Sequence, residues 1–344
     1  MNRYIVPRMF GLSRPLMFLL LPLGAVANGP SSPPQDPESI GTQNAADGVL
    51  LNLTEVDSRL TVPVAVGGKG PYPFIIDTGA ERTVVSSQLA SKLQLAPGGR
   101  VTMISMTEIG PVDTVIVPEL AIESIGIRHT IVAPSLDARN LGASGMLGLD
   151  TLANHRVLID FEAGTMTVHP SKPHRRARAE DSDEIVVTAK SKFGQLIVTD
   201  AYYGNARIQV VLDTGASVSM GNEAFRRLVG RGRGRTKPVE IRSVTGGTMN
   251  LDYATVPNVK IGDVTVATLP VAFVAAVPLR RWDLVKRPAL MLGMDALRSF
   301  RRVDIDFPNR QVRFLMPKGS GRNRDGTGLR SRAGGATRLP DFQR

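Results

Sequence analysis

The chain has 344 residues, enough for two domains of ordinary size, and it lacks cysteine, which excludes disulfides, thiolate nucleophiles and cysteine-ligated zinc. Hydrophobic residues make up 42% of the chain but aromatic residues only 5%, so any core is aliphatic. The net charge is +11 at pH 7, of which a basic tail at residues 318–344 contributes +5, with seven basic residues against two acidic ones. The four histidines form no close pair, so neither a metal site nor a cofactor is predicted.

Residues 1–27 have the features of a secretory signal peptide. Arginines precede an apolar run at residues 16–23, and the small-residue pattern Ala25-Val26-Ala27 follows it. We therefore predict cleavage after Ala27 and export of the mature protein to the periplasm or cell envelope. The run is shorter than the ~20 residues of a membrane-spanning helix, so no stable membrane insertion is expected after cleavage. The alternative interpretation of this segment is an uncleaved N-terminal anchor.

Residues 28–47 are rich in Pro, Ser, Gly and Gln, a composition that predicts a disordered linker. A first lobe is predicted over residues 48–170, where short apolar or alternating segments are separated by turn residues. A short helix is predicted over residues 86–95 of this lobe. The strands predicted in the first lobe are residues 60–66, 74–76, 100–106, 114–117, 120–122, 127–132, 157–161 and 165–168.

A polar, charged stretch at residues 171–184 is unable to bury a core, and we predict that it links the first lobe to a second lobe at residues 185–317. Its arginines do not indicate nucleic-acid binding, because an acidic run cancels their charge and no aromatic residue is interleaved. The second lobe has a predicted helix at residues 223–229, and the Gly- and Arg-rich tail at residues 318–344 is predicted to be disordered. The strands predicted in the second lobe are residues 196–203, 208–212, 239–244, 248–253, 259–261 and 264–274.

The second lobe repeats the motifs of the first lobe in the same order. The sequence FIIDTGA at residues 74–80 returns as VVLDTGA at residues 210–216, and a Met-Leu-Gly segment and an Ile-Asp-Phe segment also return. The spacing between copies is 136 residues at the Asp, 145 at the Met and 146 at the last match. This preserved order, with about ten residues inserted, indicates an internal duplication.

Each copy of the repeated loop ends a buried apolar strand with an aspartate, Asp77 or Asp213. An ionised aspartate in a core costs several kcal/mol unless a partner satisfies it. Two aspartates side by side would share one proton, because like charges about 3 Å apart cannot both ionise. In each copy the Gly permits a sharp turn, and the Thr hydroxyl can hydrogen-bond across to the partner loop. The alternative is that both aspartates are turn formers that cap the next segment.

The doubled Asp-Thr-Gly-Ala loop resembles the active-site loop of retropepsin-like aspartic proteases, in the two-lobed, pepsin-like arrangement and in a bacterial exported form. The resemblance implies an all-β fold with two closed, barrel-like lobes, an active-site cleft between them, and a peptide or protein substrate. It implies that Asp77 and Asp213 are catalytic. The other residues of the two loops would support them: Thr78, Gly79, Ala80, Thr214, Gly215 and Ala216. Two apolar-apolar-Gly segments would cross beneath the loops: Met146, Leu147 and Gly148, and Met291, Leu292 and Gly293.

The resemblance also implies one flap per lobe, around residues 104–111 and 243–248, although neither segment has a recognisable signature. The sequence departs from the family at Glu81, where retroviral enzymes usually have Asp and pepsins have Ser. Asp150 and Asp295 follow the apolar-apolar-Gly segments, and we interpret them as caps of the helix or turn that comes next.

The predicted activity is hydrolysis of peptide bonds by a water molecule activated between Asp77 and Asp213. The predicted assembly is a monomer with two lobes, because one chain supplies both carboxylates. One alternative is a peptide-binding or scaffolding protein without turnover. The other is a protease assembled by pairing lobes of different chains.

Overall fold

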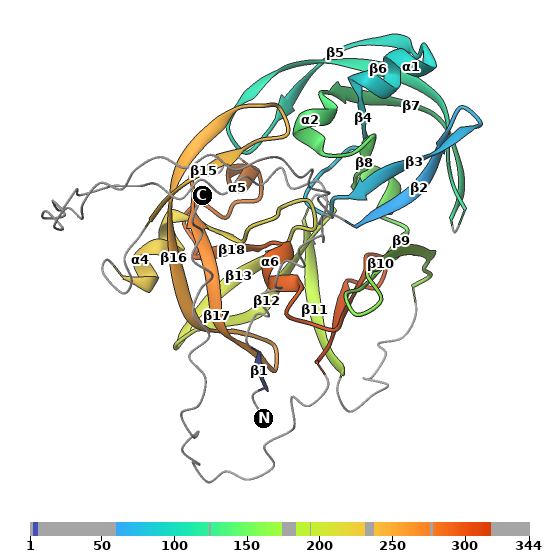
Figure 1. The fold of residues 1–344 in the computed structure, drawn as a ribbon. Coiled ribbons are helices and arrows are strands. Elements are labelled where there is room, and N and C mark those ends of the chain that lie inside the picture. Colours follow the sequence, from blue (N-terminus) through green and yellow to red (C-terminus); the bar gives the residue numbers. More distant parts are fainter. Residues whose placement is uncertain are drawn as a thin grey trace, which may run out of the picture.

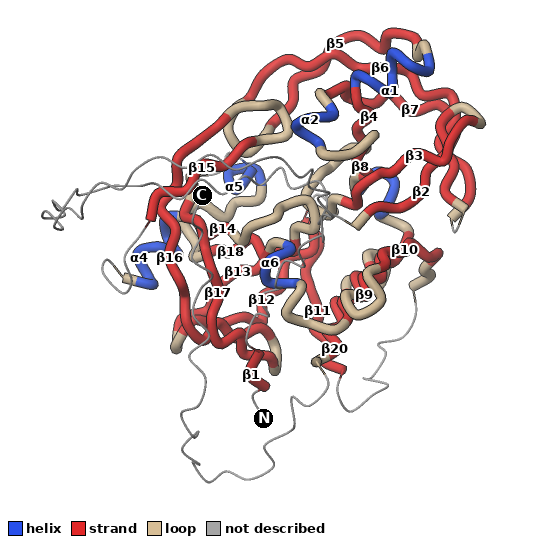
Figure 2. The backbone as a smooth tube through the Cα atoms, viewed as in Figure 1, coloured by secondary structure: helices blue, strands red, loops and turns tan. Residues whose placement is uncertain are grey.

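The computed structural model contains two β-rich lobes joined by a shared sheet (Figure 1). Strands dominate both lobes, and the helices are short segments between them (Figure 2). The all-β fold class with two related lobes is therefore confirmed. The structure describes residues 3–5, 60–123, 125–173, 184–192, 194–230, 237–275 and 278–317.

Strands of the first lobe form a closed ring, because β2 and β6 pair with each other as well as with their other neighbours. In order around the ring the strands are β2 (Thr61–Val66), β3 (Lys69–Ile76), β8 (Gly145–Leu147), β4 (Val84–Ser86), β7 (Gly126–Leu136) and β6 (Ile109–Ile122). Outside the ring, β5 (Ala96–Ile104) forms a long hairpin with β6. The helices of this lobe are α1 (Ser87–Leu93), α2 (Ala138–Leu141) and α3 (Leu149–Leu152).

The second lobe has a ring of the same order, closed by pairing of β12 with β16. Its strands are β12 (Gln195–Tyr203), β13 (Ala206–Leu212), β18 (Ala289–Leu292), β14 (Met220–Gly221), β17 (Val264–Phe273) and β16 (Thr248–Ile261). Outside this ring, β15 (Lys237–Arg242) forms a hairpin with β16. The helices are α4 (Glu223–Val229), α5 (Pro278–Arg281) and α6 (Met294–Leu297). The matching ring order confirms the internal duplication.

Alternating side chains in the strands and polar N-caps of the helices explain the local structure of the lobes. Side chains alternate along β2, so its three valines are buried in the ring while the residues between them face outward or lie half-buried. Ser86 caps α1, with its hydroxyl accepting a hydrogen bond from the backbone N–H of Leu89 at 3.1 Å. Asn222 caps α4 in the same way, accepting from the N–H of Phe225 at 2.8 Å. The two caps are 136 residues apart, the same spacing as the repeated aspartates.

A sheet made by both lobes joins them: β10 (Thr165–Pro170), β9 (His155–Asp160), β19 (Arg302–Asp306), β20 (Gln311–Leu315) and β11 (Glu184–Lys192). The equivalent strands β9 and β19 pair antiparallel at its centre, with Leu158 opposite Asp304. These two residues are 146 positions apart, the spacing between copies at this point, so a local two-fold axis passes through them. Glu184 is the first residue of β11, paired with Leu315, and not part of the linker as predicted.

Several sequence predictions concern residues outside those that the structure describes. These are most of the signal segment, the linker at residues 28–47, residues 174–183 between the lobes, and the tail at residues 318–344. Within the first of these segments the structure describes β1 (Arg3–Ile5), which pairs in parallel with β17. Among the helices described, none combines the length and the hydrophobicity that crossing a bilayer requires.

Candidate active site

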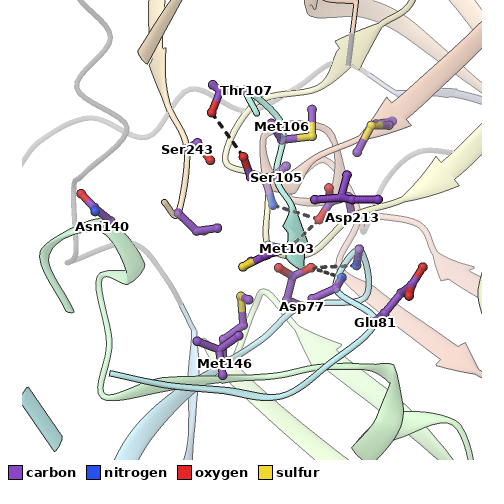
Figure 3. Close-up of a pocket in the computed structure, with 18 of the residues that line it drawn as sticks. Asp77, Glu81, Met103, Ser105, Met106, Thr107, Asn140, Met146, Asp213 and Ser243 are labelled. Carbon is purple, nitrogen blue, oxygen red and sulfur yellow. Dashed lines mark hydrogen bonds between the residues drawn. The ribbon is translucent and has the colours of Figure 1, made fainter. Parts of the chain in front are cut away.

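Asp77 and Asp213 occupy the same position in the two lobes. Asp77 follows β3 and Asp213 follows β13, and each strand pairs in parallel with a short strand, β8 or β18. The backbone N–H of Asp77 extends the first pairing by donating to Leu147 O at 3.0 Å, and that of Asp213 extends the second by donating to Leu292 O at 3.0 Å. Figure 3 shows the two aspartate side chains close together where the lobes meet. The sheet of each lobe thus delivers one carboxylate to a common point.

Each carboxylate accepts hydrogen bonds from the backbone of its own loop. Asp77 Oδ1 accepts from the N–H groups of Gly79 at 2.7 Å and of Ala80 at 3.0 Å. Asp213 Oδ1 accepts from the N–H groups of Gly215 at 3.0 Å and of Ala216 at 3.1 Å. Donors of this kind favour the charged form of a carboxyl group.

The glycines of the two loops let the carboxylates approach each other. A Cβ atom on Gly79 would lie 2.7 Å from Asp213 Cγ, and one on Gly215 would lie 2.3 Å from Asp77 Cγ. Burial raises the pKa of Asp213, and the negative charge of Asp77 and a side-chain hydrogen bond to it raise this pKa further. Two buried like charges beside each other oppose each other's ionisation, which favours a proton on one member of the pair.

Thr78 and Thr214 tie the two loops together by reciprocal hydrogen bonds. Thr78 Oγ1 donates to Leu212 O at 2.8 Å and accepts from Thr214 N at 3.1 Å. Thr214 Oγ1 donates to Ile76 O at 2.7 Å and accepts from Thr78 N at 3.1 Å. All four bonds cross between lobes and are buried, so they fix the register of the two aspartates.

The apolar-apolar-Gly segments lie directly under the loops. Strand β8 pairs with β3 on one side and with β4 on the other, and these two strands flank the loop of Asp77. A Cβ atom on Gly148 would lie 2.4 Å from the carbonyl carbon of Arg82, and one on Gly293 would lie 2.7 Å from that of Val218. A glycine is therefore needed where each segment passes beneath the chain that leaves its loop.

Asp150 and Asp295 do not cap the helices that follow them, contrary to the interpretation from sequence. The N-cap positions of α3 and α6 are glycines. Asp150 instead accepts hydrogen bonds from the backbone N–H of Thr83 at 2.9 Å and from its hydroxyl at 2.7 Å. Asp295 accepts from the N–H of Ser219 at 3.0 Å and from its hydroxyl at 2.7 Å. Both aspartates hold the chain just after an active-site loop, and neither reaches the space between the loops.

The β5–β6 hairpin and the β15–β16 hairpin meet at their tips above the aspartates. Their tips, at residues 105–108 and 243–247, share a Ser-x-Thr sequence, and Ser105 Oγ accepts a hydrogen bond from Thr245 Oγ1 at 3.3 Å. Met106 of the first tip packs against an apolar cluster of the second lobe, and Val244 of the second tip packs against a cluster of the first. Each tip thus crosses to the opposite lobe. Neither tip's signature was recognised from the sequence, although aligning the two halves at a spacing of 138 brings the Ser-x-Thr sequences together.

A cavity of about 420 Å³ lies between the loops and the hairpins. Both aspartates open into it, and its walls are mostly apolar, with Met103 and Met146 beside Asp77 (Figure 3). At its rim Glu81, next to the first loop, pairs with Arg281 of the second lobe, with Nε–Oε1 at 2.5 Å and Nη2–Oε2 at 3.0 Å. This bidentate pair joins residues 200 positions apart, so no local sequence signal indicates it. Among the described residues, no cluster of His, Asp and Glu side chains has the arrangement of a metal site.

The chain matches a known protein family in both lobes. A family model described as aspartyl protease matches residues 62–151 and 199–296, one match in each lobe and together more than half of the chain. Among solved structures, a retropepsin-like aspartic protease from Rickettsia conorii is similar, with 20% sequence identity and a TM-score of 0.30, over 39% of this chain and 90% of that chain. A search of the curated proteins found no match.

Proposed function

This chain belongs to the aspartyl protease family, and we propose that it is an endopeptidase in which Asp77 and Asp213 together activate a water molecule. One observation carries the proposal. The two carboxylates have equivalent backbone partners and border each other across the lobe junction, beneath a cavity large enough for a segment of peptide. If the aspartates only formed turns, nothing would require two carboxylates side by side or a cavity above them.

The mechanism follows from the coupled carboxyl groups. One of the pair is ionised and takes a proton from a water molecule held between them, and the other is protonated and donates to the oxygen of the substrate carbonyl. The water oxygen bonds to the carbonyl carbon to give a tetrahedral amide hydrate. The hydrate breaks at the C–N bond as a proton moves to the leaving nitrogen, and the pair returns to its starting protonation. No covalent bond between enzyme and substrate is required. Because the two groups titrate as a unit, acid and base are roles of the pair.

The substrate is an extended peptide with apolar side chains near the cleaved bond. The cavity lies between the loops and the hairpins, and Met, Val and Ile make up most of its apolar lining residues. An extended chain pairs readily with strand edges, and β5 and β15 end the sheets on the side of the hairpin tips. The tips are in contact through Ser105 and Thr245, and their separation would widen the access of a peptide to the cavity.

We also propose that the active unit is one chain, exported and cleaved after Ala27. The four threonine hydrogen bonds join two lobes of the same molecule, and this supports a monomer over pairing between chains. The proposal of export rests on the sequence of residues 1–27. N-terminal sequencing of protein from the native envelope tests it. Asn28 as the first residue is the expected result, and intact Met1 in the cytoplasmic fraction would contradict it.

The decisive experiment incubates the purified mature protein with a mixed peptide library, with and without pepstatin, at several pH values. We expect internal cleavage of peptides, detected by mass spectrometry, that pepstatin suppresses. A protein that binds library peptides without cleaving them at any pH would instead support the peptide-binding alternative. Cleavage that is insensitive to both pepstatin and loss of the two aspartates would point to a different site.

A further inference from the structure

Half of the methionines of this chain line one cavity. The sequence contains 12 methionines, and three from each lobe border the space above the aspartates. They are Met103, Met106 and Met146 of the first lobe and Met220, Met249 and Met291 of the second lobe. Three of the others lie within the predicted signal segment, and the remaining three, Met166, Met294 and Met316, are buried away from the cavity. A solvent-exposed surface or an average core would not concentrate this residue at one site.

The six methionines form two layers around the cavity. Met146, Met220 and Met291 belong to the walls and are 2%, 6% and 2% exposed. Met103, Met106 and Met249 come from the two hairpins that roof the cavity, and all three are half-buried. We call these three the hairpin methionines. Their thioether groups are the ones within reach of a small solute, while the wall methionines lie deeper.

Apolar packing surrounds the hairpin methionines. Met106 and Met249 pack against a cluster that contains Trp282, the single tryptophan of the chain. Met103 packs against a cluster that contains Met146 (Figure 3). Flexible, polarisable thioethers adapt to side chains of many shapes, which suits a cleft that takes varied apolar residues. The same sulfur atoms are oxidised readily, and the chain has no cysteine thiol to react before them.

We propose that the cleft is an oxidation-sensitive site at which peroxide converts the hairpin methionines to sulfoxides and so prevents binding of apolar peptides. The link to activity rests on the proposed function. In each oxidation one oxygen atom passes from hydrogen peroxide to a thioether sulfur, so that an S=O bond forms, the O–O bond breaks and water leaves. The sulfur loses two electrons and the peroxide gains them. Each sulfoxide carries a polar S=O group, and the neighbours of the hairpin methionines are apolar. A bound apolar peptide would bury this group without a hydrogen-bond partner, and the cost of that burial opposes peptide binding.

The test compares each protein with itself before and after peroxide. Peptide mapping by mass spectrometry identifies the oxidised methionines, and kcat/KM is measured on an apolar library peptide. For the wild type we expect kcat/KM to fall at least about tenfold, mainly through KM, since binding of apolar side chains is what is lost. Reductases for the two sulfoxide epimers should restore it. Far-UV circular dichroism should stay unchanged.

Matched variants separate this site from general damage. In Met103→Leu/Met106→Leu/Met249→Leu the ratio of treated to untreated kcat/KM should stay within about threefold of one, whatever the basal rate of the variant, because leucine keeps the apolar volume without the sulfur. In Met166→Leu/Met316→Leu, whose changes lie outside the cavity, the ratio should fall as in the wild type. An equal loss in the triple variant and the wild type, or full oxidation of the hairpin methionines with unchanged kcat/KM, would overturn the proposal.

A second readout does not depend on turnover. Binding of a labelled hexapeptide of leucine, valine and phenylalanine is followed by anisotropy, and the emission of Trp282 reports on the cluster that Met106 and Met249 contact. Oxidation should weaken peptide binding at least about tenfold and shift the emission in the wild type, but not in the triple variant. If no peptide is cleaved before oxidation, the proposed function fails, while these measurements still decide whether oxidation closes the cleft. Unchanged binding after oxidation would refute the proposal on its own.

Discussion

Replacing Thr78 by valine tests the reciprocal hydrogen bonds that hold the two active-site loops together. Valine keeps the shape of threonine but removes the hydroxyl group, so Leu212 O loses its donor and Thr214 N–H loses its acceptor. Thr78 is 2% exposed, so water is not available to replace the hydroxyl. A buried polar group left without a partner costs about 1–3 kcal/mol, so two such groups should lower the free energy of unfolding by about 2–6 kcal/mol.

The matched control is Thr78→Ser, which keeps the hydroxyl and loses one methyl group, at a cost of about 1 kcal/mol. Thr214→Val should cost as much as Thr78→Val, because its hydroxyl makes the equivalent bonds to Ile76 and Thr78. Urea unfolding followed by circular dichroism measures all three variants. The reasoning is refuted if Thr78→Val is as stable as Thr78→Ser. Loss of peptide hydrolysis should parallel the loss of stability, since the same bonds set the distance between Asp77 and Asp213.

Three further predictions concern the aspartates and the assembly. Asp77→Asn and Asp213→Asn should each lower peptide hydrolysis by about 10²–10⁴-fold without unfolding the protein, and a variant that keeps more than a tenth of the rate would exclude a general acid–base role. Because the pKa of Asp213 is raised in the folded state, its contribution to stability is complete below its ordinary value of 3.8 and is lost as the pH rises through the folded value. The free energy of unfolding of the wild type should therefore fall relative to that of Asp213→Asn between about pH 4 and pH 8 in urea titrations, and parallel curves would contradict this. Specific activity should stay constant over about a hundredfold dilution, and light scattering on the same samples should give the mass of one chain. Loss of activity on dilution, together with a dimeric mass, would mean that the catalytic pair forms between chains.

Sequence reasoning located the paired loops because their signal is local and occurs twice. An aspartate after three apolar residues indicates a carboxylate at the end of a buried strand, and the structure places Asp77 and Asp213 at the ends of β3 and β13. The duplicated order of motifs predicted two similar lobes, and both rings have the same strand order. Patterns that recur within one chain therefore predicted most of the fold.

Contacts between residues that lie far apart in the chain could not be predicted from the sequence. The pairing of Glu81 with Arg281 depends on how the lobes are placed, and the sequence of α5, which contains Arg281, does not repeat that of its counterpart α2. Asp150 lies in the first turn of a helix, where a capping role is a reasonable expectation. Its carboxylate binds Thr83 instead, because the strand that leaves the loop passes close to it and presents both a backbone N–H and a hydroxyl. Thr83 is buried, so its N–H and hydroxyl need a partner, and the carboxylate of the exposed Asp150 supplies it.

The two copies carry the same residue where the threonines bond across the lobe junction, and they differ at a nearby position of the loops. Thr78 and Thr214 bond to equivalent backbone atoms of the opposite loop, so a change in one copy leaves buried groups of the other copy without partners. Glu81 aligns with Ser217, and this pair of positions has no such mutual contact among the described residues. A homodimer must carry the same residue at both positions, whereas a single chain need not. Fusion of the lobes thus lets the two walls of the cleft diverge in charge while the aspartates remain held by symmetric bonds.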